Sequence, residues 1–133
     1  MASSSSYEAL TALVVEDDEF TRQLVAQALG VIGFGAVSQA GDGEAAIKSC
    51  MDRLPDIIYC DIEMEPMNGI DFLKALRRTK LERVREMPVI FLTSHGESEI
   101  VREAMQAGVD AFILKPPTLK KLKDKTDALL DNS

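Results

Sequence analysis

Short apolar runs alternate along the chain with longer segments in which apolar residues recur every three or four positions. The apolar runs predict strands at residues 7–15, 36–40, 55–60, 89–92 and 111–114. The longer segments predict amphipathic helices at 19–32, from 43 onward, from 69 onward, at 97–106 and at 119–130, while 77–85 is expected to be a solvated connection. The alternation predicts an α/β fold: a doubly wound, five-stranded parallel sheet in the flavodoxin-like order 2-1-3-4-5, with five helices.

Several residues mark the ends of the predicted helices. Asp42 and Asn68 are suitable N-caps for the second and third helices, and Gly33 is a suitable C-cap for the first. The apolar positions of the first helix have helical spacing: Phe20, Leu24, Val25, Ala28, Leu29 and Ile32. The strand at 55–60 has no polar alternation, so we expect both of its faces to be buried.

Four of the predicted strands lead directly into polar residues. These are Glu16-Asp17-Asp18 after the first strand, Asp61 after the third, Thr93-Ser94 after the fourth and Lys115-Pro116 after the fifth. In an open parallel sheet, ligands bind outside the carboxyl ends of the strands. The sequence therefore predicts one site that holds several carboxylates beside a hydroxyl and an ammonium group.

Composition narrows the class of protein. The chain has 133 residues and a net charge of −7, which fits one domain and argues against direct nucleic-acid binding. Cys50 and Cys60 lack metal-ligand spacing, so we expect them to be buried free thiols. No signal peptide or membrane-spanning run is visible, and this predicts a cytoplasmic protein without membrane insertion.

The predicted cluster suits a divalent cation and a phosphoryl group. Mg²⁺ prefers oxygen ligands, so Asp17 and Asp61 are candidate direct ligands, and Glu16 is a candidate ligand through water. Asp61 would then be a nucleophile that forms an aspartyl-phosphate. Lys115 and the Thr93 hydroxyl would stabilise the charge of the transferring group.

Each of these residues also has a structural explanation when taken alone. An Asp after a strand is often a turn residue, and Glu16-Asp17-Asp18 could cap the first helix. Thr93 could be a cap or turn hydroxyl, and Lys115 could simply be solvated. Four complementary groups at the ends of four strands are harder to explain by turn preferences, which favours the functional interpretation.

These segments resemble the receiver domains of two-component response regulators. The resemblance extends from about Glu8 to Leu130 and rests on Val14-Val15-Glu16-Asp17-Asp18, Asp61-Ile62-Glu63-Met64-Glu65-Pro66-Met67-Asn68-Gly69, Leu92-Thr93-Ser94 and Leu114-Lys115-Pro116. It implies a single receiver domain at 8–133, and the low-complexity serine run at the start of the chain predicts a flexible tail at residues 1–7. In scale, the chain is similar to the single-domain chemotaxis-type regulators.

The resemblance implies roles for further residues. Asp61 would be the phosphoacceptor, and the Glu63 backbone carbonyl would join the Mg²⁺ ligands. Thr93 would be the switch hydroxyl, Phe112 the aromatic residue that moves with it, and Lys115-Pro116 a cis peptide. Glu63 and His95 would tune the lifetime of the phosphoryl group. Glu65 precedes Pro66 where the family usually has Pro directly after the Met64 position, which leaves the shape of this loop open.

The sequence therefore predicts a stand-alone receiver that is phosphorylated on Asp61 by a histidine kinase or a histidine phosphotransfer protein. Phosphorylation would change the face formed by the helix at 97–106, the strand at 111–114 and the helix at 119–130, and so control the binding of a partner protein. The protein would be a monomer or a phosphorylation-dependent dimer. It would not be a conventional enzyme, although it would catalyse its own phosphorylation and dephosphorylation.

Other functions remain open at this point. The chain could be an intermediate or phosphate sink in a phosphorelay, or a protein-binding module that acts without phosphorylation. A phosphatase of the haloacid-dehalogenase type is less well supported because Glu16 and Asp18 only approximate its D-x-D pattern. A nucleotide or flavin binder is also less well supported, because the sequence has no glycine-rich phosphate-binding motif.

Overall fold

The strands form one parallel sheet with the predicted order. The computed structural model describes residues 7–96 and 98–130. Within them the sheet runs β2-β1-β3-β4-β5, and every neighbouring pair is parallel. The strands are β1 (Thr11–Val15), β2 (Ala36–Ala40), β3 (Ile57–Asp61), β4 (Val89–Thr93) and β5 (Ala111–Leu114).

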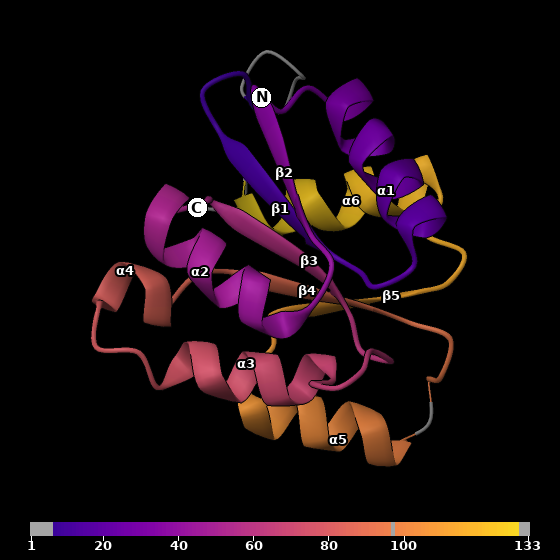
Figure 1. The fold of residues 1–133 in the computed structure, drawn as a ribbon. Helices are drawn as coiled ribbons and strands as arrows, with labels where there is room; N and C mark the ends of the chain where they lie inside the picture. The colour runs from indigo at the N-terminus through magenta and orange to yellow at the C-terminus, as the bar shows by residue number, and fades with distance from the viewer. Residues whose placement is uncertain (1–6, 97, 131–133) are drawn as a thin grey trace.

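Helices cover both faces of this sheet (Figure 1). They are α1 (Glu19–Ile32), α2 (Gly43–Arg53), α3 (Gly69–Arg77), α4 (Glu82–Arg85), α5 (Ser98–Ala107) and α6 (Leu119–Leu130). Helices α1 and α6 pack on one face, and α2, α3 and α5 pack on the other, so the sheet separates two apolar clusters. This is the doubly wound architecture that the alternating pattern predicts.

The two central strands β3 and β4 are buried along their whole length. All five residues of each strand are buried, as the absence of polar alternation predicts. Large side chains such as Ile58 and Phe91 are fully excluded from solvent, and each contributes about 1.5–3 kcal/mol of hydrophobic stabilisation. The carboxyl ends of β3 and β4 are therefore held in a rigid, water-poor environment.

The predicted helix caps are confirmed. The side chain of Asp42 accepts a hydrogen bond from the Ala45 N–H at 2.8 Å, and that of Asn68 accepts one from the Asp71 N–H at 2.8 Å. Gly33 ends α1 with a φ of 126°, in the region that favours glycine. These local interactions satisfy backbone groups that helix ends leave unpaired.

The N-terminal boundary differs from the prediction. Strand β1 begins at Thr11, because residues from Tyr7 form a turn in which Tyr7 O accepts a hydrogen bond from the Leu10 N–H at 3.0 Å. Tyr7 itself is buried: its ring stacks on Phe34 with centroids 5.3 Å apart, and its hydroxyl donates to Asp127. The rest of the predicted tail, residues 1–6, lies outside the described residues.

The connection after α3 is more ordered than expected. The stretch 77–85 contains the short helix α4, so the described residues form six helices rather than the predicted five. Val84 on α4 is fully buried and contacts the cluster beneath α3. One apolar residue among many charged ones gives little periodicity, which explains why the pattern missed this helix.

Helix α1 buries a narrower stripe than the sequence suggests. Val25, Leu29 and Ile32 are buried, whereas Phe20 and Leu24 are 71% and 50% exposed. At 3.6 residues per turn, Phe20 and Leu24 lie well to one side of the buried stripe. No helix among the described residues is long and apolar enough to cross a membrane.

Candidate functional site

Asp61 occupies the last position of the central strand β3, with its side chain buried. Only 2% of the residue is exposed. Its neighbours in the sheet are β1 on one side and β4 on the other. The Lys115 Nζ lies 2.8 Å from Asp61 Oδ1 and forms an ion pair with it. The structure therefore brings together the carboxylate and the ammonium that the sequence assigns to one site.

Glu16 and Asp17 follow β1 and reach the same place. One carboxylate oxygen from each of Glu16, Asp17 and Asp61 lies within 4.8 Å of the other two. Glu16 is 3% exposed, whereas Asp17 is exposed. Glu16 Oε2 accepts a hydrogen bond from the Asp18 N–H at 3.0 Å. Glu16 Oε1 is buried, lies 3.7 Å from Lys115 Nζ and has no hydrogen-bond partner among the described residues.

Burial and proximity change the titration of these groups. Burial, followed by repulsion from Asp61, raises the pKa of Glu16 from 4.5 to about 7, although a hydrogen bond from the Asp18 backbone opposes the shift. Burial also raises the pKa of Asp61, although the neighbouring Lys115 opposes that shift. Two buried carboxyls with a single ammonium between them carry unbalanced negative charge, which a bound cation would relieve.

Lys115 is held in the site by the backbone as well as by charge. Its N–H donates to Thr93 O at 2.8 Å, and the Lys115-Pro116 peptide is cis, as the family resemblance implies. Burial alone lowers the pKa of the ammonium, but the contacts with Asp61 and Glu16 outweigh it and raise the pKa. Lys115 therefore remains charged over the physiological range.

Thr93 is the last residue of β4, the strand that pairs with β3, and its hydroxyl forms hydrogen bonds with residues other than Asp61. It donates to Glu63 Oε2 at 2.9 Å, with His95 O as a second acceptor at 3.2 Å. The His95 N–H donates to Thr93 Oγ1 at 3.0 Å. The hydroxyl therefore has to leave Glu63 before it can contact a group attached to Asp61.

The remaining predicted residues surround the carboxylate cluster. Glu63 is exposed and takes part through Thr93 rather than through the acidic cluster. Phe112 on β5 is partly buried, with its ring centroid 6.3 Å from that of Phe91 on β4. It therefore lies on the strand beside the one that carries Thr93.

The loop after β3 returns close to the backbone of Asp61. The Gly69 N–H donates to Ile62 O at 2.8 Å, and a Cβ at Gly69 would lie 2.6 Å from Asp61 O. Only glycine fits such an approach without a shift of the backbone. The loop also contains a cis Glu65-Pro66 peptide, which answers the question that the position of Pro66 left open.

Two interactions near the site were missed by the sequence analysis or only partly foreseen. Arg22 on α1 donates from Nη1 to Glu16 O at 2.9 Å and from Nε to Gln39 Oε1 at 3.2 Å, so it holds the acidic loop against β2. The only feature of the sequence that could have predicted this interaction is the position of Arg22 one helical turn after Asp18. Asp18 caps α1 by accepting from the Thr21 N–H at 2.9 Å, so the capping explanation holds for Asp18 but not for its buried neighbour Glu16.

The residues present fit a hard divalent cation. Carboxylate oxygens are the ligands that Mg²⁺ prefers, and three of them converge here from β1 and β3. The buried, unpartnered Glu16 Oε1 is the clearest sign that the protein alone does not satisfy the site. The chemistry of this cluster therefore supports a metal ion beside Asp61.

The chain is similar in sequence and in fold to known proteins. A family model described as the response regulator receiver domain matches residues 12–127. The probable chemotaxis protein CheY of Rhizobium etli is 32% identical over 122 residues, which are 92% of this chain and 93% of that protein. The solved structure of chemotaxis protein CheY4 of Vibrio cholerae has a TM-score of 0.85 at 27% identity, covering 91% of this chain and 98% of that chain.

A further solved structure bears on the ligands and partners of such proteins. It is the CheX-CheY complex of Borrelia burgdorferi with BeF3 and Mg²⁺. The similarity has a TM-score of 0.82 at 26% identity and covers 90% of this chain and 88% of that chain.

Proposed function

The chain belongs to the response regulator receiver domain family, and from that premise we propose that Asp61 accepts a phosphoryl group and thereby controls the binding of a partner protein. The observation that carries the proposal is the buried Asp61 carboxylate with Lys115 Nζ 2.8 Å away and two further carboxylates beside it. A structural Asp at a strand end has no need of this environment. A nucleophile that receives a phosphoryl group does.

The reaction is a displacement at phosphorus. An Asp61 carboxylate oxygen forms the new bond while the bond between phosphorus and the donor group breaks, and the donor leaves with the bonding electrons. The Lys115 ammonium stays beside Asp61 and stabilises the negative charge of the phosphoryl oxygens. The donor that fits this step is a phosphohistidine of a histidine kinase or of a histidine phosphotransfer protein.

We assign the metal ligands to the same cluster. The Asp17 and Asp61 carboxylates and the Glu63 backbone carbonyl would hold Mg²⁺ directly, and Glu16 would act through water. The bound ion would neutralise the carboxylate repulsion and polarise the phosphoryl oxygens. The CheX-CheY complex with Mg²⁺ and BeF3 supports this assignment as a related protein whose structure contains the ion.

The switch begins at Thr93. In the structure its hydroxyl donates to Glu63, and a phosphoryl group on Asp61 offers a stronger, charged acceptor. When the Thr93 hydroxyl turns toward the phosphoryl group, it frees space beside β5, and Phe112 can move into that space. The surface of α5, β5 and α6 then changes its affinity for a partner protein, since a ligand shifts the equilibrium toward the conformation that it binds better.

This surface has the composition of a binding site. Met105 on α5, Leu114 on β5 and Leu119 at the start of α6 are 64%, 52% and 46% exposed. Each of these large apolar side chains would lose its contact with water if a protein covered it, which favours association. The partner is therefore a protein that covers apolar side chains, and a second copy of the chain would meet the same requirement.

Intact mass spectrometry tests the phosphoacceptor. After incubation with acetyl phosphate and Mg²⁺, we expect one phosphoryl adduct on the parent protein and none on Asp61→Asn. Omission of Mg²⁺ or addition of a chelator should remove the adduct from the parent. An adduct that persists on Asp61→Asn would refute the assignment and make Asp18 the first alternative.

The lifetime of the adduct tests the roles of Glu63 and His95. Substitution of either residue by alanine should change the rate of dephosphorylation by more than it changes the Mg²⁺ affinity, because both residues lie around Thr93 rather than within the carboxylate cluster. The decay of the adduct and the binding of Mg²⁺ are measured on the same samples. Equal lifetimes in parent and variants would rule out the tuning role.

A further inference from the structure

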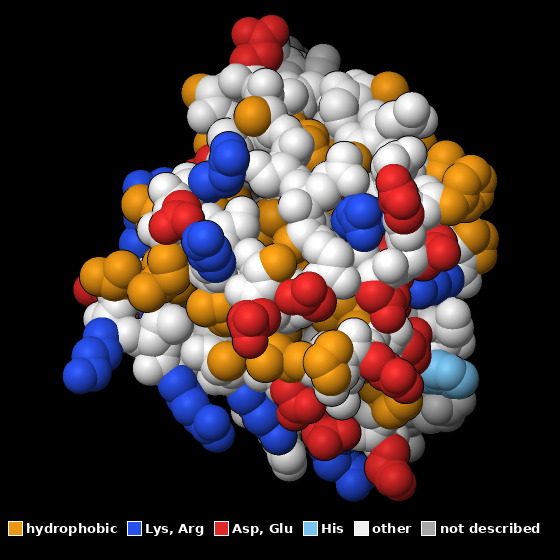
Figure 2. Space-filling view, in the orientation of Figure 1, with side chains coloured by type: hydrophobic (Ala, Val, Ile, Leu, Met, Phe, Trp, Pro, Cys, Tyr) orange, Lys and Arg blue, Asp and Glu red, His pale blue; other side chains and the backbone are white. Residues whose placement is uncertain are grey.

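The segment from Lys74 to Arg85 is basic in an acidic protein. It carries six of the 15 Lys and Arg residues of the chain but one of its 22 Asp and Glu residues, whereas the whole chain has a net charge of −7. This segment comprises the second half of α3, the following turn and α4. Figure 2 shows Lys and Arg side chains gathered below and to the left, over these elements.

Some of these cations are used by the fold and others are not. Arg77 donates to the carbonyls of Arg85, Met87 and Gly108 and pairs with Asp110. By contrast Lys74, Arg78 and Lys80 are exposed, and within the described residues their side chains form no ion pair or hydrogen bond. The structure therefore gives a reason for Arg77 but none for the three exposed cations.

An exposed apolar side chain lies among these cations. Leu81, next to Lys80, is 52% exposed, and Arg83 on α4 extends into solvent with 64% of its side chain exposed. We call Lys74, Arg78, Lys80, Leu81 and Arg83 the basic end. Helix α4 precedes β4, so the basic end lies toward the amino ends of the strands, a strand length of roughly 15 Å from the carboxyl ends that hold Asp61.

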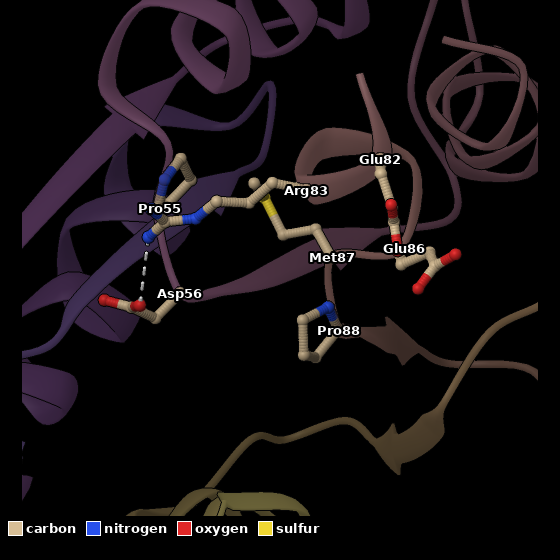
Figure 3. Close-up of a pocket in the computed structure, with 7 residues that line it drawn as sticks. All are labelled: Pro55, Asp56, Glu82, Arg83, Glu86, Met87 and Pro88. Carbon is tan, nitrogen blue, oxygen red and sulfur yellow. Dashed lines mark ion pairs between the residues drawn. The ribbon is translucent and has the colours of Figure 1, made fainter. Parts of the chain in front are cut away.

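The surroundings of α4 indicate which anionic partner fits. A hollow of about 500 Å³ borders α4, and Asp56, Glu82 and Glu86 line it together with Arg83. Figure 3 shows Arg83 reaching across to Asp56, where the ion pair measures 3.6 Å. Three carboxylates around one arginine would repel any anionic group placed in this hollow, so an anionic partner would contact the exposed cations outside it.

Long-range charge also separates two kinds of partner. A nucleic acid or an anionic membrane extends well beyond the basic end and faces the acidic remainder of the chain. At physiological salt, charge is screened over about 8 Å, so a short acidic segment bound at the basic end escapes most of that repulsion. An apolar residue within such a segment would cover Leu81.

We propose that the basic end is a docking surface for a short acidic segment of a partner protein, with an apolar residue in that segment packing on Leu81. Docking here leaves the carboxyl ends of the strands open, so the partner can hold the receiver while Asp61 is phosphorylated. The proposal goes beyond the phosphorylation switch and does not depend on it. The proposal rests on three exposed cations whose side chains have no partner among the described residues, and on the exposed Leu81 that follows Lys80.

A peptide titration tests the proposal. The probe is a short fluorescent peptide of Glu and Asp around one central Leu, titrated with the full chain at low salt. We expect binding that weakens as salt rises and that falls by about tenfold or more in Arg78→Glu/Lys80→Glu, since each reversal replaces an attraction with a repulsion. Acetyl phosphate should modify Asp61 at the same rate in this variant and in the parent.

The matched control is Lys120→Glu/Lys125→Glu, which makes the same change of charge on α6, on the other face of the sheet. It should weaken binding of the peptide by less than about threefold. A second control replaces Leu81 by Ser, and it should weaken the Leu-containing peptide more than a version with Gln at the central position.

Three outcomes would overturn the proposal. The first is an absence of peptide binding to the parent at low salt. The second is an equal loss in the α3–α4 and α6 variants, which would show an unspecific response to net charge. The third is binding to phosphatidylserine vesicles or to duplex DNA as tight as to the peptide, which would make the surface a polyanion site instead.

Discussion

The two ends of the sheet use aspartate in opposite ways. At the amino ends, Asp56 accepts a hydrogen bond from the Thr11 N–H at 2.8 Å, and Asp110 accepts one from the Val89 N–H at 2.8 Å. Each also pairs with an arginine, Arg83 or Arg77. At the carboxyl ends, Asp61 and Glu16 are buried side by side with Lys115, and Glu16 keeps a buried oxygen without a hydrogen-bond partner among the described residues.

The difference separates structural from functional carboxylates. An Asp that accepts a neighbouring strand's N–H completes the sheet and needs nothing else. Two buried carboxylates that share a single ammonium raise the free energy of the protein unless a ligand is bound. The carboxylates at the carboxyl ends are therefore suited to binding a ligand and the aspartates at the amino ends to stability, so substitutions around the two sets should show their effects in different measurements.

The largest expected effect is that of Lys115→Met on the rate of Asp61 phosphorylation. Lys115→Met should slow the phosphorylation of Asp61 by acetyl phosphate by about 100-fold, because it removes the cation that stabilises the phosphoryl oxygens. In saturating Mg²⁺, which would neutralise the two buried carboxylates in place of the ammonium, the urea midpoint of this variant should stay near that of the parent. Time-resolved intact mass measures the rate, and a rate within a few-fold of the parent's would exclude an electrostatic role for Lys115.

Arg77→Met should show the opposite behaviour at the other end. Arg77 links α3 to the connections before β4 and β5 through carbonyl and carboxylate acceptors. Its loss should lower the free energy of unfolding by about 2–3 kcal/mol, since three carbonyls, two of them in partly buried contacts, lose a charged donor. The phosphorylation rate of the folded variant should stay within about twofold of the parent's.

Arg83→Met is the matched control for Arg77. Among the residues that the structure describes, Arg83 forms one ion pair, at 3.6 Å, and its side chain is 64% exposed. Its substitution should cost about 0.5 kcal/mol or less. If urea denaturation gave equal losses for Arg77→Met and Arg83→Met, the hydrogen bonds of Arg77 would not be the source of its stabilising effect.

The stability of Glu16→Gln as a function of pH should show how much the buried charge of Glu16 destabilises the metal-free protein. The folded protein holds a proton on Glu16 up to its pKa of about 7, whereas the unfolded chain releases it near 4.5. The parent therefore loses stability as pH rises from 4.5 to 7. Glu16→Gln lacks this loss, so its advantage over the parent should grow from near zero at pH 4.5 to on the order of 2 kcal/mol at pH 8.

An Mg²⁺ titration is the control for the pH dependence of Glu16→Gln. Added Mg²⁺ should stabilise the parent more at pH 8 than at pH 5, because binding favours the ionised carboxylates. The same titration on Glu16→Gln should show weaker Mg²⁺ binding with less dependence on pH. An advantage of Glu16→Gln that does not vary with pH would show that charge on Glu16 is not what destabilises the metal-free protein.

The smallest effects come from two glycines with different surroundings. Gly69→Ala should lower stability by about 1–2 kcal/mol, because its Cβ would lie 2.6 Å from Asp61 O and displace the loop. Gly30→Ala on α1 should raise stability by about 0.5–1 kcal/mol, since a Cβ there meets no atom within 4 Å. Thermal unfolding compares them, and a stabilised Gly69→Ala would contradict the close approach.

Patterns that repeat over a short span were enough to predict the frame of this protein. Buried runs and helical spacing located every strand of the sheet, and residues such as Asp42 and Asn68 marked helix starts because a cap bonds to a backbone group three residues away. The site could be predicted for a related reason. Parallel strands share a carboxyl edge, so residues after β1, β3, β4 and β5 must lie near one another.

Tertiary packing decided the properties that depend on distant partners. Glu16 and Asp17 are neighbours in sequence, yet one is buried with a raised pKa and the other is exposed. The Thr93 hydroxyl donates to Glu63, which is 30 positions away in the sequence. The short helix α4 is held in place by the packing of its buried residue Val84 beneath α3. Periodicity reports which face of an element is apolar, whereas burial, charge pairing and hydrogen-bond partners arise only when the elements pack together.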